Sequence, residues 1–327
     1  MYVTKQDGCT LKIEEIKEHK IRYPKKDIIT LLNALEVKGV KFSIVTKENA
    51  KKNLENLNYY YKLTVYKRNF NKSSEGKYLN LEFSYLGDIA SVDMQLRYIL
   101  AQFCLDIEHS LKTLLMKEVT ENNNLDGYDI IEQFIQSTEK SHSPISKNSL
   151  FKKASHISNY QYALYNTHKD CPPVWAVLEI MSFGEFTRLL EFYLNRYPKK
   201  GLSVSSLRGL LAGVKRVRNM SMHSTPFLFD LSSNPLEHVN NCLVGYCFKL
   251  NIKKPYYKMK KIHDVICVLY MHDEFVKGQG SRVNRCEDLS SLVDRSTLRF
   301  HYLNQGSEIM KFFSTLRLIL DNYDNKL

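Results

Sequence analysis

One apolar stripe, between Asp93 and Val119, constrains the fold of this chain more than any other feature. Its members follow one another at spacings of four, three, four, four and three residues, and they are Leu96, Leu100, Phe103, Ile107, Leu111 and Leu114. That spacing is the period of an α-helix with one buried face. The stripe therefore predicts a long helix around which the rest of the chain packs. Glu108 and Lys112 lie on a neighbouring stripe, in the order that favours an i,i+4 ion pair.

Helical periodicity also covers much of the remaining chain. Helices are expected over residues 28–38, from a cap at Thr46 onward, and over residues 174–193, 207–222 and 309–320. Gly184 interrupts the pattern at 174–193 and indicates a kink or a close helix contact there. The apolar run at 243–250 fits a strand or a helix, because its periodicity does not separate the two. The fold class predicted from these patterns is predominantly all-α.

The chain is strongly basic. It has 327 residues with a formal net charge of +12, which favours nucleic acid or an anionic membrane surface as a partner. No apolar run approaches the ~20 residues that a membrane span needs. Met1 is not followed by the apolar segment of a signal peptide. We therefore expect a cytoplasmic protein without a membrane partner.

The cysteines indicate neither a metal site nor a redox motif. There are seven of them, and no pair has the CxxC spacing. His238, Cys242 and Cys247 come nearest to a set of metal ligands, but a fourth ligand is not evident. Reduced thiols, no metal and no cofactor are expected.

Two stretches, at 57–78 and 249–261, interleave aromatic and cationic side chains. Aromatic planes can stack on bases while lysines contact phosphates, so the mixture is typical of RNA binding. The alternative is that the tyrosines belong to the core and the lysines to a solvated face. The predicted RNA contacts are Tyr59, Tyr60, Lys62, Tyr66, Lys67, Arg68, Lys72, Lys253, Lys254, Tyr257, Lys258, Lys260 and Lys261.

The segment from Arg218 to His223 carries the residue types that metal-free RNA cleavage needs. Histidine can move a proton near neutral pH, and arginine is a fixed cation for the phosphate. On a regular helix these two residues are about 140° apart, whereas Asn219 and His223 share a face. A composite cleft between two copies in a homodimer would bring both groups together, and Glu108 could orient either one. The alternative is a histidine that caps the helix or complements its dipole.

Four segments together resemble the bacterial abortive-infection AbiD/AbiF family, whose members carry a HEPN-type helical domain. They are Asn58–Leu63 with Tyr66, Asp93–Glu108, Pro173–Gly184, and Val217–Asn219 with His223, in the family's order over residues 30–230. The chain departs from the family at Met222, where a small residue is usual. It also departs at Ser224–Phe227, where a second histidine often follows.

The resemblance implies phage defence through growth arrest or death. It implies a HEPN-like helical core over residues 89–240, between an N-terminal helical, basic-aromatic region at 1–88 and a C-terminal basic, helical extension at 241–327. Arg218 and His223, with Asn219 and Glu108, would cleave RNA through its 2′-hydroxyl and leave a 2′,3′-cyclic phosphate. The alternative function is an RNA-binding module of the same fold that cuts nothing and holds a structured non-coding RNA.

Overall fold

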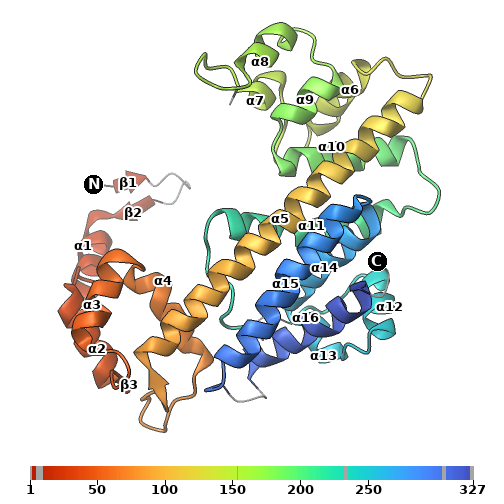
Figure 1. Ribbon diagram of the computed structural model, residues 1–327. Coiled ribbons are helices and arrows are strands. Elements are labelled where there is room, and N and C mark those ends of the chain that lie inside the picture. Colours follow the sequence, from red (N-terminus) through yellow and green to blue (C-terminus); the bar gives the residue numbers. More distant parts are fainter. Residues whose placement is uncertain (1, 5–9, 153, 232–234, 304–306, 325–327) are drawn as a thin grey trace. The chain divides into compact units, whose positions relative to one another are not determined.

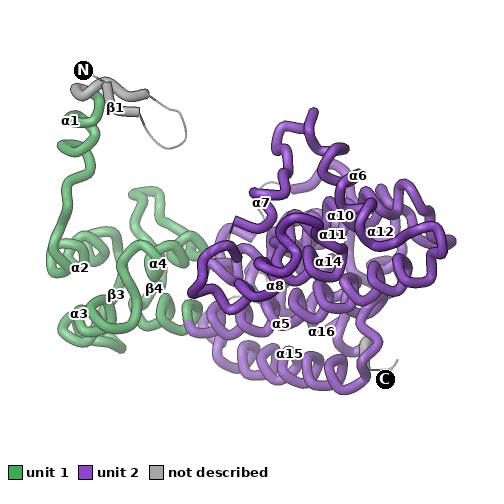
Figure 2. Tube along the Cα trace, turned by 90° about the horizontal axis from the view of Figure 1, so that it is seen from above, with its two compact units in different colours: residues 1–90 green, residues 91–327 purple. Residues whose placement is uncertain are grey.

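The computed structural model describes residues 2–4, 10–152, 154–231, 235–303 and 307–324. The chain forms two compact units, residues 1–90 and 91–327, which Figure 2 colours separately. Helices make up most of the described chain, so the predicted all-α class is confirmed. The second unit contains all but the first two residues of the predicted core region at 89–240, together with the predicted extension at 241–327.

The first unit joins short helices to two small strand pairs. Its elements are β1 (Tyr2–Thr4), β2 (Thr10–Lys12), α1 (Ile13–Arg22), α2 (Ile28–Val37), β3 (Val40–Lys41), α3 (Lys47–Asn56), α4 (Tyr60–Thr64), the 3-10 helix η1 (Val65–Asn69) and β4 (Leu81–Glu82). β1 and β2 pair antiparallel, and β3 and β4 pair parallel with Val40 opposite Leu81. As predicted, Thr46 caps α3, because its hydroxyl accepts the Asn49 N–H at 3.3 Å.

The second unit is built on the long helix predicted around Asp93–Val119. Its helices are α5 (Phe83–Glu121, which begins in the first unit), α6 (Asp129–Thr138), α7 (Lys147–Phe151), α8 (Tyr162–His168), α9 (Val174–Ile180), α10 (Phe183–Arg196), α11 (Val204–Met222), α12 (Asn241–Lys249), α13 (Lys254–Tyr257), α14 (Lys260–Phe275), α15 (Gln279–Arg299) and α16 (Glu308–Asp324).

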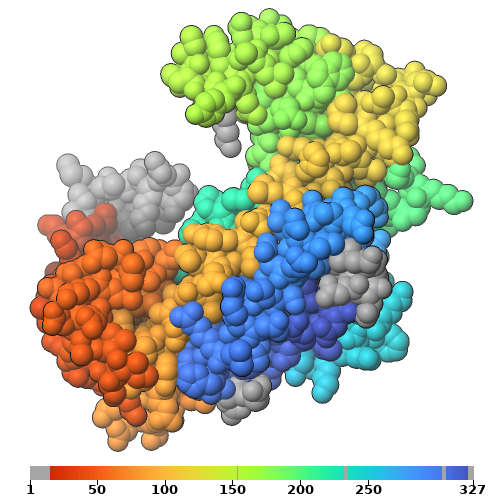
Figure 3. Space-filling view, viewed as in Figure 1, coloured from red at the N-terminus to blue at the C-terminus, as the bar shows by residue number. Residues whose placement is uncertain are grey.

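α5 is the axis of this unit. Its stripe from Leu96 to Leu111 is fully buried, as the periodicity predicts. α15 lies beside α5, as Figures 1 and 3 show, and the Arg285 Nε donates to the Asp106 carboxylate at 2.9 Å. α11 packs against both α10 and α14. Helices from before and after residue 240 therefore build one core.

The helix predicted over 174–193 is two helices, which corrects the sequence interpretation. α9 ends at Ile180, Met181 is extended with a ψ of 148°, and α10 begins at Phe183. Ser182 accepts the Glu185 N–H, and the Glu185 carboxylate accepts the Ser182 N–H at 2.7 Å. This capping box starts a new helix, so the break has a cause other than Gly184.

The described residues after residue 240 form α12 to α16 and short connections between them. The ambiguous run at 243–250 is α12 together with its C-cap. Searching the described residues for a helix with the length and apolar character of a membrane span finds no candidate.

Candidate functional site

α11 ends at the predicted motif, and a defined backbone turn places His223 at that end. Ser224 has a φ of +53°, the Thr225 N–H donates to the Met220 carbonyl at 2.9 Å, and the Ser224 N–H donates to the Ser221 carbonyl at 3.2 Å. These bonds form a Schellman turn in which serine stands where glycine is usual. The helix therefore stops one residue before His223, and the His223 side chain is exposed.

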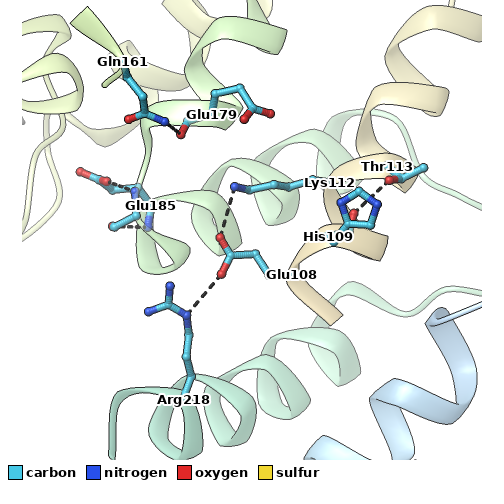
Figure 4. Close-up of polar contacts among 9 residues, drawn as sticks. Glu108, His109, Lys112, Thr113, Gln161, Glu179, Glu185 and Arg218 are labelled. Atoms are coloured by element: carbon cyan, nitrogen blue, oxygen red, sulfur yellow. Dashed lines mark hydrogen bonds and ion pairs between the residues drawn. The ribbon is translucent and has the colours of Figure 1, made fainter. Parts of the chain in front are cut away.

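Arg218 lies against the central helix rather than in open solvent. Its Nε donates to the Glu108 Oε2 at 3.2 Å, and the Lys112 Nζ lies 3.2 Å from the other oxygen of the same carboxylate. Figure 4 shows Arg218 and Lys112 reaching Glu108 from two helices. The Arg218 guanidinium also lies 5.5 Å from the centre of the Phe183 ring. Glu108 thus holds a guanidinium at the junction of α5, α10 and α11.

The structure brings Glu108 to Arg218 and leaves the other two motif residues apart. Asn219 and His223 are exposed, whereas the Arg218 side chain is only 25% exposed. Among the described residues, no hydrogen bond or ion pair of the His223 imidazole is found. The regular-helix separation of about 140° does not apply strictly to Arg218 and His223, because α11 ends at Met222 and His223 is its C-cap.

Two further lysines add positive charge beside Arg218. The Lys215 Nζ lies 2.9 Å from the point that a Cβ on Gly184 would occupy. Gly184 thus leaves room for the Lys215 ammonium at the start of α10. The Lys112 Nζ lies 6.0 Å from the Phe186 ring. Sequence spacing gave no sign of the contact between Phe183 and Arg218, because it forms only through the fold.

A buried carboxylate fixes the chain that follows the motif. The Asp93 Oδ1 accepts the N–H groups of Phe227 and Leu228 at 2.7 and 2.6 Å, and its Oδ2 accepts the Arg97 Nε at 2.9 Å. Asp93 and Arg97 are both fully buried. The exit from α11 is therefore tied directly to α5.

The predicted RNA contacts of the first unit divide into exposed and buried side chains. Tyr59 is 61% exposed, whereas Tyr66 is fully buried and its ring belongs to the core. Tyr60 is half-buried, and burial raises its pKa. Lys62 is half-buried as well.

Three cations of the same unit gather around Lys67. Burial lowers the pKa of Lys67, and the positive charges of Lys38, Lys72 and Arg68 lower it further. The Lys72 Nζ lies 4.9 Å from the centre of the Tyr78 ring. This cluster of like charges suits an anion in an aromatic setting.

The C-terminal basic stretch also divides. Lys253, Lys254 and Lys260 are exposed, Lys258 is half-buried, and Tyr257 is buried. Lys261 points inward: its Nζ donates to the carbonyls of Phe227 and Phe229 and lies 3.7 Å from the Phe229 ring. Lys261 thus ties α14 to the segment after the motif, and its ammonium is already used by the protein.

One buried cluster has the residue types of a metal site. His263, Asp264 and Cys267 place possible ligand atoms within 4.8 Å of one another. Both Asp264 oxygens accept from Arg216, at 2.7 and 2.6 Å. Because a guanidinium already neutralises the only carboxylate of this cluster, the arrangement serves an ion pair between α11 and α14.

The model of one protein family, described as Abi-like protein, matches residues 52–228. Searches of curated proteins and of solved structures find no significant match. The matched range is more than half of the chain. It includes α5 with Glu108, the start of α10, and all of α11 with its motif. The chain therefore belongs to the Abi-like protein family, which points to abortive infection, a defence against phage.

Proposed function

We propose that this protein acts in phage defence by binding RNA and cleaving it without a metal, through a HEPN-type motif. The observation that carries the proposal is the end of α11. There, Glu108 of the central helix α5 binds the Arg218 side chain, and His223 is exposed five residues after Arg218. A fixed guanidinium and an accessible imidazole are the two groups that the reaction requires.

The chemistry follows from these two groups. RNA supplies the nucleophile, because its 2′-hydroxyl lies beside the phosphate. The His223 imidazole takes the proton of that hydroxyl as the oxygen attacks phosphorus, and an imidazole then protonates the leaving 5′-oxygen. Arg218 neutralises the charge that grows on the phosphoryl oxygens. The products are a 2′,3′-cyclic phosphate and a 5′-hydroxyl, and DNA is not a substrate.

Two copies of the chain complete the site. Glu108 of α5 holds Arg218, while His223 is exposed just past the end of α11, so a second motif helix facing the first supplies the second group. Lys112 and Lys215 lie beside Arg218 and add positive charge for the RNA backbone. The exposed cations Lys253, Lys254 and Lys260 extend the basic surface.

The test incubates the purified full chain with mixed-sequence RNA in EDTA and measures cleavage. Product ends are identified as cyclic phosphates when treatment with a kinase removes them. His223→Ala is expected to slow cleavage by roughly 10²–10⁴-fold, the usual contribution of a general acid or base. Arg218→Ala is expected to slow it by roughly 10²–10³-fold. His238→Ala is the matched control, because His238 is another exposed histidine of the same unit.

Cleavage that survives in His223→Ala at the wild-type rate would remove this residue from the mechanism. One observation favours a second function, a non-cleaving RNA-binding module that holds a structured non-coding RNA. The charge of Arg218 is already balanced by the Glu108 carboxylate, which leaves less of it for a phosphate. Tight RNA binding without cleavage by the wild-type chain, seen also as copurifying RNA, would establish the module instead.

A further inference from the structure

A cleft lies beside α5, and neither Glu108 nor Arg218 is among its lining residues. Its volume is about 780 Å³. It lies between α5, the loop before α11 at 199–202, and the turn from α14 to α15. His109 and Thr113, which line it, lie on a different face of α5 from Glu108, as Figure 4 shows. The cleft is therefore separate from the proposed cleavage site.

Lysines from all three elements line this cleft. They are Lys117 of α5, Lys199 and Lys200 of the loop, and Lys277 of the turn. Lys199 is paired with Glu118, and Lys117 lies 3.7 Å from Glu121. Within the described parts of the chain, no carboxylate partner of Lys200 or Lys277 is found. Both are exposed. The Lys277 Nζ donates to the Glu274 carbonyl at 2.6 Å, and because an ammonium has three N–H donors it can still contact an anion.

Part of the lining of the same cleft is apolar. Leu114, Leu202 and Phe275 are half-buried and line it, and these three residues are called its floor below. Ser110 and Ser281 line the cleft as well. A flat apolar group with a few polar atoms fits such a floor, and a phosphate fits the cationic rim. A volume of this size is in the usual range of small-molecule sites, about 300–1,000 Å³.

Two ion pairs fix the walls of the cleft. The Arg285 Nε donates to Asp106 at 2.9 Å, and the Arg282 Nη2 donates to Asp273 at 2.8 Å. Asp106 itself lines the cleft, but Arg285 neutralises its charge. Glu274 is then the only acidic lining residue without such a partner among the described lining residues. The balance of charge along the rim is positive.

We propose that this cleft binds a nucleotide, with its phosphate on Lys200 and Lys277 and its base on the floor formed by Leu114, Leu202 and Phe275. A free nucleotide and a nucleotide of an RNA strand bound at the motif both present a phosphate and a base. Either source therefore fits this cleft. This site goes beyond the proposed cleavage, and binding to it does not require Arg218 or His223.

The experiment measures binding to the full chain by calorimetry, with ATP in one arm and a non-hydrolysable 2′-O-methyl RNA hexamer in the other. Lys200→Glu/Lys277→Glu is expected to weaken binding by at least about tenfold, or 1.4 kcal/mol, in the arm that reports the true source. Leu202→Trp fills the space above the floor without changing the charge, and it is also expected to weaken binding by at least about tenfold. Lys140→Glu is the control, since Lys140 is an exposed lysine of the same unit outside the cleft.

The two arms separate the possible outcomes. ATP binding that the cleft variants abolish identifies a free nucleotide as the ligand. Loss confined to the hexamer identifies a nucleotide of the bound strand. Unchanged binding in both arms for the cleft variants, with circular dichroism showing that they are folded, overturns the proposal. Because the hexamer is not cleaved, a failure of the nuclease proposal leaves this result interpretable.

Discussion

At the scale of single residues, Glu108 illustrates which side-chain contacts can be predicted from a sequence and which cannot. Its pairing with Lys112 is local, so a four-residue spacing on a helix predicted it, and the structure has the pair at 3.2 Å. Its pairing with Arg218 joins residues that are 110 positions apart. The residues themselves brought Glu108 and Arg218 into one hypothesis before any family resemblance, but that hypothesis left open whether Glu108 contacts Arg218 or His223.

Replacing Glu108 by glutamine is expected to destabilise the fold. The Arg218 and Lys112 side chains, 25% and 21% exposed, would lose their shared anion. The expected loss is about 1–3 kcal/mol in the free energy of unfolding, measured with urea. Glu121→Gln on the same helix is the control. Its pair with Lys117 is 3.7 Å long and well exposed, so a change below about 0.5 kcal/mol is expected. Equal effects of the two variants would contradict a special role of Glu108.

His272 is expected to make the stability of the protein depend on pH. The pKa of His272 is lowered to about 4, chiefly by burial; the hydrogen bond and charge of Asp106 oppose this shift, and the charges of Arg282 and Arg285 add to it. The unfolded chain, in which this pKa is near 6.5, then binds more protons than the folded chain. Stability is full above pH ~6.5 and falls as the pH is lowered toward 4, by up to about 1.4 kcal/mol per unit.

Urea unfolding at closely spaced pH values between 4 and 7.5 measures this dependence. His272→Gln removes the titrating group, so its slope in that window is expected to be smaller even if its overall stability is lower. An unchanged slope in the variant would assign the pH dependence to other groups.

At the scale of elements, local patterns predicted where helices form but not how they meet. The stripe in α5 is a repeated spacing along one segment, and it was readable for that reason. The break between α9 and α10 also has a local cause in Ser182 and Glu185, which the glycine nearby obscured. By contrast, the contact of α11 with α14 depends on Gly213, because a Cβ there would lie 2.7 Å from the Cys267 Sγ. No local signal marks that glycine.

Gly213→Ala is expected to lower stability by about 1–3 kcal/mol, because the added methyl group forces α11 and α14 apart. Gly245→Ala is the matched control within α12, since nothing lies within 4 Å of the position of its Cβ. There the change is expected to raise stability by roughly 0.5–1 kcal/mol through helix propensity. Thermal unfolding of both variants distinguishes packing from propensity. A stabilised Gly213→Ala would show that the two helices are not in close contact.

At the scale of the whole molecule, the change in sequence character along the chain does not coincide with the boundary between the two compact units. The change in character after residue 240 suggested an extension, yet α14 packs on the motif helix through the Arg216–Asp264 pair. Hydrophobic periodicity shows which face of a helix is buried, but not which other element packs against that face. The boundary of a compact unit depends on which elements pack together, so periodicity alone does not give it.

A fragment that ends at residue 240 is therefore expected to lose cooperative folding of the second unit. It lacks α14, so the side of α11 that carries Gly213 and Arg216 would be exposed to water. Thermal melts by circular dichroism and binding of a hydrophobic dye measure the effect. Adding residues 241–327 as a separate chain is expected to restore the melt. A sharp melt of the short fragment alone would show that residues 91–240 suffice.

The family match ends at residue 228, but α14, which packs against α11, begins at Lys260. α11 therefore lies within the matched range and α14 lies outside it. An exchange of C-terminal halves between related proteins would separate Arg216 from Asp264 and Gly213 from Cys267. We expect viable recombinants only where both sides of that contact are transferred together, so the two segments evolve as one unit.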